Sequence, residues 1–297
     1  MAEPIALLGG GAIGQLLAAL LARQGVEPVI IGRPGTSREV REHQLTRLDG
    51  KRFRHRLCHL PPESMAACQA LLVTTKAYQA EQALTPLLPR LCPQTPIVLL
   101  HNGMGPQQRL AQRHPDKQWW AGTLTDGALR EAPCSVRHTG LGQRFAGPLG
   151  EGGTLPQGLA AIGFEMDRNI HLRLWQKLAV NALINPLTAL HRCRNGELTR
   201  PEFLEPLTRL SQELVQVAAS QGVVLDAAQV LALGLTVAEA TAANRSSMLS
   251  DIEAQRKTEI EAISGYVVTV ARSAGLEAPA HHDNLQQVLA LEAQSLG

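Results

Sequence analysis

Short runs of hydrophobic residues mark the first half of the chain, and they predict buried strands. Ile5–Leu8 and residues 29–31 are two such runs, and the Leu- and Ala-rich residues 15–24 between them predict a helix. Residues 70–75 and 97–100 predict two more strands. Strands that alternate with helices are typical of βαβ units in a parallel sheet.

The pattern then changes to shorter strands. Polar and apolar residues alternate over residues 45–58, which favours small added strands. Residues 119–125 and 134–146 also have strand patterns, and their short connections favour antiparallel pairing. Residues 147–158 are dense in Gly and Pro and predict a loop.

After the short segment Phe164-Glu165-Met166, the strand pattern gives way to helical periodicity. We place a domain boundary near Asp167, with domains at 1–167 and 168–297. The sequence therefore predicts an α/β protein, in which a Rossmann-type dinucleotide-binding domain precedes an all-helical domain. In the second domain Thr258-x-x-Glu261 has the form of a capping box, and it predicts a helix from there to about Ala274.

The predicted helix over residues 172–190 combines an apolar face with a polar stripe. The apolar face has helical spacing and consists of Leu174, Leu178, Ala182 and Leu183. Lys177, Asn181 and Asn185 follow one another at four-residue intervals and therefore line one side of the helix. Such a stripe is either a solvated face or a site for a small polar anion. One ammonium and two carboxamides suit the anion.

Composition narrows the classes of function. A net charge of +2 gives no basic patch for nucleic acid or a membrane surface. Five widely spaced cysteines favour free thiols in a reducing cytoplasm over disulfides or a metal site. The pair His281-His282 lies in a polar stretch, and we expect it to be solvated. No apolar run reaches membrane-spanning length, and the first residues lack the basic region of a signal peptide.

The strongest local motif is Gly9-Gly10-Gly11-Ala12-Ile13-Gly14, a G-x-G-x-x-G between a predicted strand and helix. In that context the motif predicts a dinucleotide site rather than a merely flexible turn. Gly9 permits the tight turn, Gly11 admits the pyrophosphate and Gly14 allows close helix packing. The free amides of the helix N-terminus favour the anion.

The end of the second strand indicates which dinucleotide binds. NAD-binding proteins usually have an acidic residue there, whereas this chain has Gly32-Arg33. An arginine can donate hydrogen bonds to a 2′-phosphate, so we expect NADPH as the cofactor, with Arg33 binding its 2′-phosphate. Arg38 and Arg41 are weaker candidates.

Two further polar residues follow predicted strands. Lys76 comes after the strand at 70–75, and Asn102 comes after the strand at 97–100. Ligands bind beyond the carboxyl ends of strands in open parallel sheets, so both residues are candidates. His101 has the same location, but a single histidine there is more often structural.

Taken together, these motifs resemble those of the ketopantoate reductase (2-dehydropantoate 2-reductase) family, which is NADPH-dependent. The matching stretches span nearly the whole chain in the family's order: the glycine motif at 9–14, Lys76-Ala77-Tyr78-Gln79, His101-Asn102-Gly103-Met104-Gly105, residues 177–189, Asn195-Gly196-Glu197-Leu198, residues 246–251 and Thr258-Glu259-Ile260.

The resemblance implies a role for each matching residue. Lys177 resembles the general acid, and Glu259 is implied to organise the active site. Substrate contacts are implied for Asn102, Lys177, Asn181, Asn185, Asn195 and Ser247. Cofactor contacts are implied for Gly9, Gly10, Gly11, Ala12, Ile13, Gly14, Arg33, Lys76, Asn102, Ala128 and Glu259. Asp126 departs from the family, which often has histidine there, so it receives no role. On pattern alone, Ser246, Ser247 and Glu259 are helix caps.

The implied reaction is reduction of a 2-keto acid, ketopantoate, with hydride from NADPH and a proton from Lys177. We expect burial to lower the pKa of Lys177 and Glu259 to raise it. One alternative is a related NADP-dependent dehydrogenase for another 2-keto or 3-hydroxy acid, and another is a non-catalytic NADPH-binding sensor. The sequence indicates no metal, nucleic-acid or membrane partner. It leaves the oligomeric state open, a homodimer being one option.

Overall fold

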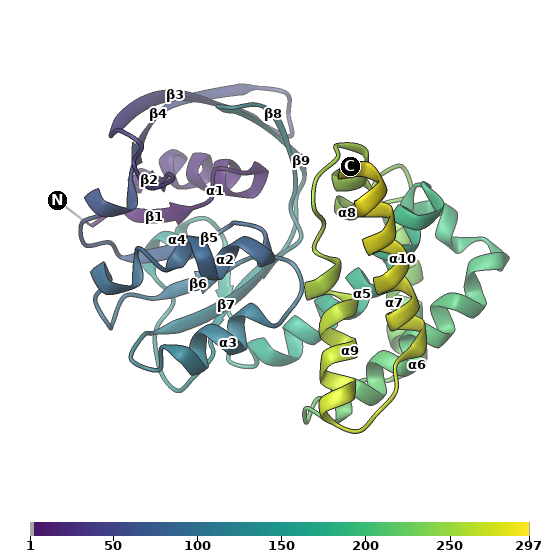
Figure 1. The fold of residues 1–297 in the computed structure, drawn as a ribbon. Coiled ribbons are helices and arrows are strands. Elements are labelled where there is room, and N and C mark those ends of the chain that lie inside the picture. Colours follow the sequence, from purple (N-terminus) through teal and green to yellow (C-terminus); the bar gives the residue numbers. More distant parts are fainter. Residues whose placement is uncertain (1–2, 297) are drawn as a thin grey trace. The chain divides into compact units, whose positions relative to one another are not determined.

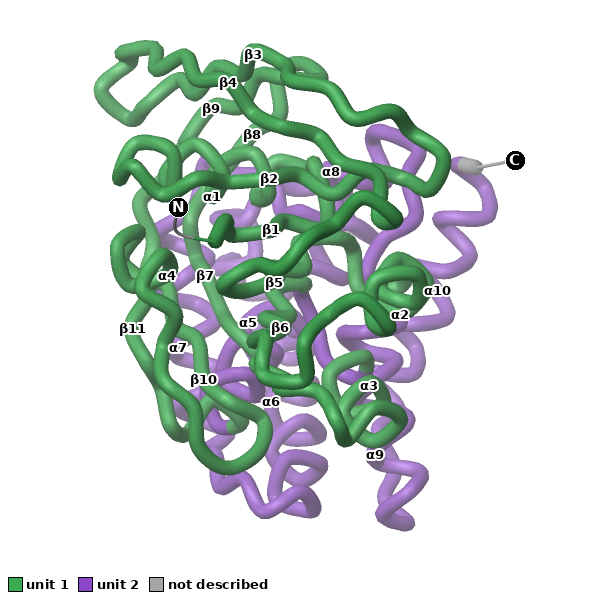
Figure 2. Tube along the Cα trace, turned by 90° about the vertical axis from the view of Figure 1, so that its left-hand side faces the viewer, with its two compact units in different colours: residues 1–101, 106–171 green, residues 102–105, 172–297 purple. Residues whose placement is uncertain are grey.

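The computed structural model describes residues 3–296 and divides the chain into two compact units, coloured separately in Figure 2. The first unit comprises the residues up to His101 together with Pro106–His171. The second unit comprises Asn102–Gly105 and the residues from Leu172 onward. The chain therefore passes into the second unit for four residues, returns, and changes over after His171, whereas the sequence pattern placed a single boundary near Asp167.

The described part of the first unit contains one eleven-stranded sheet, in the order β11-β10-β7-β6-β5-β1-β2-β4-β3-β9-β8. Its strands are β1 (Ile5–Leu8), β2 (Pro28–Ile31), β3 (Glu39–Thr46), β4 (Arg52–Leu60), β5 (Ala70–Val73), β6 (Ile97–Leu99), β7 (Trp119–Leu124), β8 (Gly127–Ala132), β9 (Ser135–Gly140), β10 (Arg144–Pro148) and β11 (Phe164–Met166). Strands β2, β1, β5, β6 and β7 pair in parallel, which is the expected Rossmann-type centre.

The later strands match their predictions in part. The antiparallel pairing expected of residues 119–125 and 134–146 is found between β7 and β10. On its other side β7 pairs in parallel with β6, because the helix α3 (Pro106–Arg113) crosses over between them. The single strand expected over residues 134–146 is two strands, β9 and β10. Strand β8 was missed because it is mostly exposed and lacks a buried apolar alternation.

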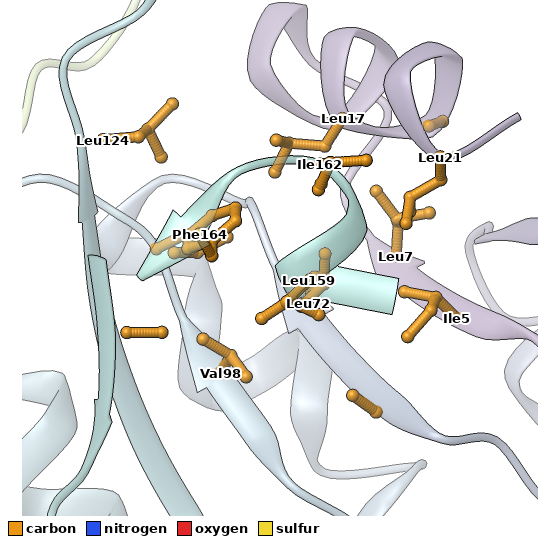
Figure 3. Packing of buried hydrophobic residues seen from close by; sticks show 14 of the residues in the cluster. Ile5, Leu7, Leu17, Leu21, Leu72, Val98, Leu124, Leu159, Ile162 and Phe164 are labelled. Carbon is orange, nitrogen blue, oxygen red and sulfur yellow. The ribbon is translucent and has the colours of Figure 1, made fainter. Parts of the chain in front are cut away.

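Helices cover both faces of the parallel centre. The helices of the first unit are α1 (Ala12–Arg23), α2 (Ala77–Leu84), α3 and α4 (Gln157–Ala161). On one face, Leu17 and Leu21 of α1 pack with Leu7 and with Leu159 of α4, as Figure 3 shows. On the other face, Leu84 of α2 and Leu110 of α3 pack with Leu8 and Val73.

Helix α1 is also covered on its second side. Strands β3, β4, β8 and β9 curve over it in Figure 1. Leu16 and Ala19 of α1 pack there against Leu45 of β3 and Val136 of β9, and all four side chains are fully or almost fully buried. Enclosure of α1 between two parts of one sheet explains why its Leu- and Ala-rich sequence has apolar residues on more than one face.

The described part of the second unit is helical. It contains most of α5 (Ile170–His191) together with α6 (Leu204–Ala219), α7 (Ala227–Ala240), α8 (Ser247–Glu253), α9 (Ser264–Ser273) and α10 (Pro279–Leu296). Short 3₁₀ turns at Asn195–Thr199, Pro201–Phe203 and Ile260–Ala262 connect some of them. Among the described residues, no helix is both long enough and apolar enough to cross a membrane. All five cysteines are described and none is in a disulfide.

The capping box predicted at Thr258 does not form. The Glu261 side chain pairs with Lys257 at 2.6 Å instead of reaching back to the backbone of Thr258. A single 3₁₀ turn follows, and α9 begins only at Ser264. The reason is local: Ile263 has φ −100° and ψ −93°, which no helix allows, so the chain changes direction before the helix can start.

The expectation that His281 is solvated was also wrong. His281 lies in α10 with no exposed surface, and its Nε2 is 3.0 Å from the Leu210 carbonyl oxygen. Its Nδ1 is buried without a hydrogen-bond partner. Burial lowers the pKa of His281 to about 4, although the contact with Leu210 acts in the opposite direction.

This burial predicts a loss of stability in acid. The unfolded chain takes up a proton at His281 near pH 6.5 and the folded chain only near pH 4, so stability is complete above about pH 6.5 and falls as the pH drops toward 4. His281→Gln keeps a donor for Leu210 but does not titrate. We expect the native protein to lose about 2 kcal/mol more than the variant between pH 7 and pH 5, measured by urea unfolding. Equal losses in the two proteins would contradict this assignment.

Candidate active site

The glycine motif forms a tight turn with space above its middle residue. Gly9 has φ +120°, and a Cβ there would lie 2.8 Å from the Thr75 backbone nitrogen. A Cβ on Gly14 would lie 1.9 Å from the carbonyl oxygen of Gly9, so only glycine fits. A Cβ on Gly11 would meet nothing within 4 Å. Thr74 Oγ1 donates to the Gly9 carbonyl at 2.8 Å and holds the turn in place.

The start of α1 offers amides to an anion. Gly11 precedes the helix and has no side chain to cap it, and the first turn contains no acidic residue. The amides of a first helical turn have no partner within the helix, and the helix dipole is positive there. Helix α1 has 12 residues, enough for that dipole to develop. The turn, the open space above Gly11 and these amides together fit a pyrophosphate.

The other predicted cofactor contacts of the first unit lie at the ends of strands. Arg33 follows β2 and is exposed, and no carboxylate of the described residues forms an ion pair with it. Lys76 is the half-buried residue that precedes α2. Ala128 is the second residue of β8, and it packs against the buried cluster around Leu16 of α1.

Sequence reasoning missed Thr74 and Thr75. Thr74 fixes the glycine turn, and the Thr75 hydroxyl is buried without a hydrogen-bond partner at the carboxyl end of β5. Their position could have identified them, because both threonines lie between the end of an apolar strand and Lys76, where ligands bind in parallel sheets.

Asp126, which departs from the family pattern, is the centre of a buried ionic cluster in the first unit. Its carboxylate accepts two hydrogen bonds from Arg144, at 2.8 and 2.5 Å, and lies 3.0 Å from His138 Nε2. The Asp126 side chain has no exposed surface. Asp126 therefore joins the end of β7 to β9 and β10, which is a structural use of this position.

Asn102–Gly105 belongs to the second unit and is hydrogen-bonded to it. Asn102 Nδ2 donates to Glu259 Oε2 at 3.1 Å, and the Met104 amide donates to the Ala262 carbonyl at 2.8 Å. Gly103 lies between them with φ +77°, and a Cβ there would be 2.3 Å from the Ala262 carbonyl oxygen. The segment therefore packs directly on the turn that follows Glu259.

Helix α5 places the predicted polar stripe on one side, and the stripe is not a solvated face. Asn185 is buried, Lys177 and Asn181 are half-buried, and the neighbouring Gln176 is exposed. The Nδ2 atom of Asn181 is buried without a hydrogen-bond partner. An unpaired buried amide costs about 1–3 kcal/mol, so this atom is a candidate donor to a ligand.

The Lys177 ammonium has the most informative electrostatics in the second unit. Burial lowers its pKa from the usual 10.5 to about 8, and the nearby negative charge of Glu259 acts in the opposite direction. The sequence predicted these two opposing effects on the pKa of Lys177, and burial is the larger one. A lysine that titrates near neutral pH is a typical proton donor in an enzyme.

The remaining predicted substrate residues flank the second half of α5. The Thr188 and Ser246 hydroxyls are hydrogen-bonded at 2.7 Å, and Ser246 Oγ caps α8 by accepting from the Leu249 amide at 3.0 Å. This hydroxyl pair ties Ser247, the exposed first residue of α8, to the part of α5 just after Asn185. Sequence reasoning identified Ser246 as a cap but missed Thr188.

Asn195 is fixed and only partly satisfied. Its Nδ2 donates to Thr241 Oγ1 at 2.9 Å, whereas its Oδ1 is buried without a hydrogen-bond partner.

The predicted site residues form two sets, one in each unit. The first unit holds Gly9–Gly14, Arg33, Lys76 and Ala128, and the second unit holds Asn102, Lys177, Asn181, Asn185, Asn195, Ser247 and Glu259.

Comparison with known proteins identifies the family. Residues 5–151 match the model described as "Ketopantoate reductase PanE/ApbA", and residues 169–292 match its C-terminal counterpart. The 2-dehydropantoate 2-reductase of Vibrio cholerae is 34% identical over 97% of both chains. That of Yersinia pestis is 36% identical over 93% of this chain and 90% of the relative. The chain belongs to the ketopantoate reductase family.

Solved structures agree on the fold. The Bacillus subtilis probable 2-dehydropantoate 2-reductase superposes with a TM-score of 0.80 at 28% identity, covering 97% of this chain and 99% of the other. A D-mandelate dehydrogenase with NADH and anilino(oxo)acetate has a TM-score of 0.89 at 23% identity, covering 98% and 99%. The Rossmann-type unit with a helical second unit is therefore confirmed, and this ketopantoate reductase family member is an oxidoreductase.

The glycine turn generates a sharp prediction. Gly11→Ala is expected to fold normally, since its Cβ meets nothing in the chain, but to lose at least tenfold in dinucleotide affinity because the methyl group fills the space above the turn. Gly150→Ala is the matched control, since its Cβ also meets nothing within 4 Å, its φ is not in the left-handed region, and it lies outside the glycine motif. Thermal unfolding and fluorescence titration with NADPH measure the two properties. Full affinity in Gly11→Ala would contradict the assignment of this space to the cofactor.

Proposed function

We propose that the chain catalyses the NADPH-dependent reduction of 2-dehydropantoate (ketopantoate) to pantoate, a step of pantothenate and coenzyme A synthesis. Membership of the family and the names of its relatives support this proposal. One observation carries it: Lys177 lies in α5 with its pKa lowered to about 8, on the same side of the helix as Asn181 and its unpartnered amide.

The residues of the first unit would hold the cofactor. The amides at the start of α1 and the space above Gly11 suit the pyrophosphate, and the exposed guanidinium of Arg33 suits a 2′-phosphate. When bound, the nicotinamide supplies the hydride.

Lys177 would manage the proton. Negative charge develops on the keto oxygen as the carbonyl carbon is reduced, and an adjacent ammonium stabilises that charge. The ammonium then gives its proton to the oxygen, which becomes the 2-hydroxyl group of the product. This role needs the protonated form, so a pKa near 8 leaves most of the lysine active at neutral pH and makes proton release easy. The negative charge of Glu259 favours the protonated form of Lys177.

The carboxamides would orient the substrate. The Nδ2 of Asn181 offers a donor to the keto acid, and the orphan Oδ1 of Asn195 offers an acceptor to a hydroxyl group. Asn185 and Ser247 would complete the set without adding charge. Asn102, held by Glu259, would contact both substrate and cofactor.

The proposal is tested by mixing the protein with NADPH and ketopantoate and following the absorbance of the reduced nicotinamide. A panel of other 2-keto and 3-hydroxy acids, the latter with NADP⁺, separates a related dehydrogenase from the proposed reductase. NADPH binding without turnover of any acid would indicate a sensor.

Lys177→Ala should lose about 10²–10⁴-fold in turnover, because it removes the proton donor. Its affinity for NADPH should be unchanged. The control is Gln176→Ala, which alters the adjacent exposed residue of the same helix and should keep full activity. Steady-state kinetics and NADPH titration decide the matter, and undiminished turnover in Lys177→Ala would refute the role.

Arg33→Ala should weaken NADPH binding about tenfold or more, since it removes charge-assisted hydrogen bonds to the 2′-phosphate. Binding of NADH, which lacks that phosphate, should change little. Arg38→Ala is the control, because Arg38 is also exposed and only five residues further along. A selective loss of NADPH affinity in Arg38→Ala and not in Arg33→Ala would mean that Arg33 does not bind the 2′-phosphate.

A further inference from the structure

Glu292 is a buried acidic residue to which none of the roles above applies. It lies in α10 and is 6% exposed. No ammonium or guanidinium group of the described residues forms an ion pair with it. A buried carboxylate without a cation is costly, so the bond that it does make is informative. Its Oε1 accepts the backbone amide of Thr258 at 2.7 Å.

That bond holds the residue immediately before Glu259. Thr258 is 1% exposed, so without Glu292 its amide would be buried and unpaired. On the other side of Glu259, the Ile260 amide donates to Thr258 Oγ1 at 3.1 Å. The Glu259 carbonyl accepts the amides of Ala262 and Ile263, each at 3.0 Å. The backbone of Glu259 is thus fixed on both sides.

The side chain of Glu259 interacts with Asn102 and Lys177 of the second unit. Its Oε2 accepts from Asn102, and its charge acts on the Lys177 ammonium. Both interactions depend on where the backbone of Glu259 lies, because this residue precedes a 3₁₀ turn and does not lie in the interior of a helix.

We propose that Glu292 is a positioning residue: by holding the Thr258 amide it sets the place from which Glu259 acts on Asn102 and Lys177. This inference rests on the proposed function for the roles of those three residues, and its geometry stands on the contacts above. Glu292 need not touch substrate or cofactor.

Two variants separate position from charge. Glu292→Asp keeps the charge but is one methylene shorter and withdraws from the Thr258 amide. Glu292→Gln loses the charge but keeps an acceptor for that amide. If Glu292 acts by position, Glu292→Asp should shift the pKa of Lys177 and Glu292→Gln should not. Val288→Ala is the control for general weakening of α10, since Val288 is fully buried one turn away.

The readout is the pH dependence of turnover. Reduction needs protonated Lys177, so turnover should fall as the pH rises through about 8. Glu259→Gln removes the charge that favours the ammonium and should move this fall to lower pH by about half a unit or more. Glu292→Asp should produce a similar shift. Combined with Glu259→Gln, it should add nothing further, because both changes act through one carboxylate.

Labelling provides a second readout that needs no activity. Acetylation of Lys177 by a limiting reagent, followed by mass spectrometry at a series of pH values, reports the pKa of its amine directly. An unshifted value in Glu292→Asp, or equal shifts in Glu292→Asp, Glu292→Gln and Val288→Ala, would overturn the positioning role. Absence of keto-acid turnover in the unmodified protein would instead defeat the proposed function, while the labelling would still decide the role of Glu292.

Discussion

The chemistry proposed for the second unit depends on one electrostatic balance, which acts on the ammonium of Lys177 in the largely buried helix α5. Burial favours loss of its proton, and the charge of Glu259 favours keeping it. If burial acted alone, the pKa of Lys177 would be lower still, and a smaller fraction of the lysine would carry a proton at neutral pH. If Glu259 dominated, the proton would be held too tightly. The turn that carries Glu259 must therefore be placed accurately, and it is bonded on both sides.

The two units differ in the groups that they offer to the proposed ligands. In the first unit the proposed cofactor contact depends on the absence of side chains: Gly9 and Gly14 fit because any Cβ would collide, and the space over Gly11 is open. In the second unit the proposed substrate contact depends on buried polar atoms without a hydrogen-bond partner, such as Asn181 Nδ2 and Asn195 Oδ1. A backbone cradle suits the constant phosphates of a cofactor, whereas a set of amides suits the particular groups of a small acid.

Short-range signals made much of this predictable. The glycine motif lies between a strand and a helix, and the four-residue spacing of Lys177, Asn181 and Asn185 needs only a continuous helix, which α5 provides. Other features were not revealed by local patterns. The parallel pairing of β7 with β6 depends on the crossover helix α3, and the burial of His281 depends on α6, about 70 residues earlier in the chain. The capping box at Thr258 failed for a local reason, because Glu261 pairs with Lys257 and the backbone of Ile263 is not helical.

Asn102 shows why such distant contacts matter for chemistry. It follows β6 in the chain, so its backbone continues directly from the parallel sheet, yet its side chain is bonded to Glu259, 157 residues away in sequence. Gly103 allows this, because any larger residue would collide with Ala262. The carboxamide implied to contact both cofactor and substrate is therefore oriented by the same carboxylate that acts on Lys177, the proposed proton donor. Under the proposed function, a change in the turn at 258–263 would alter substrate orientation and proton supply together, which is a reason for that turn to be rigid.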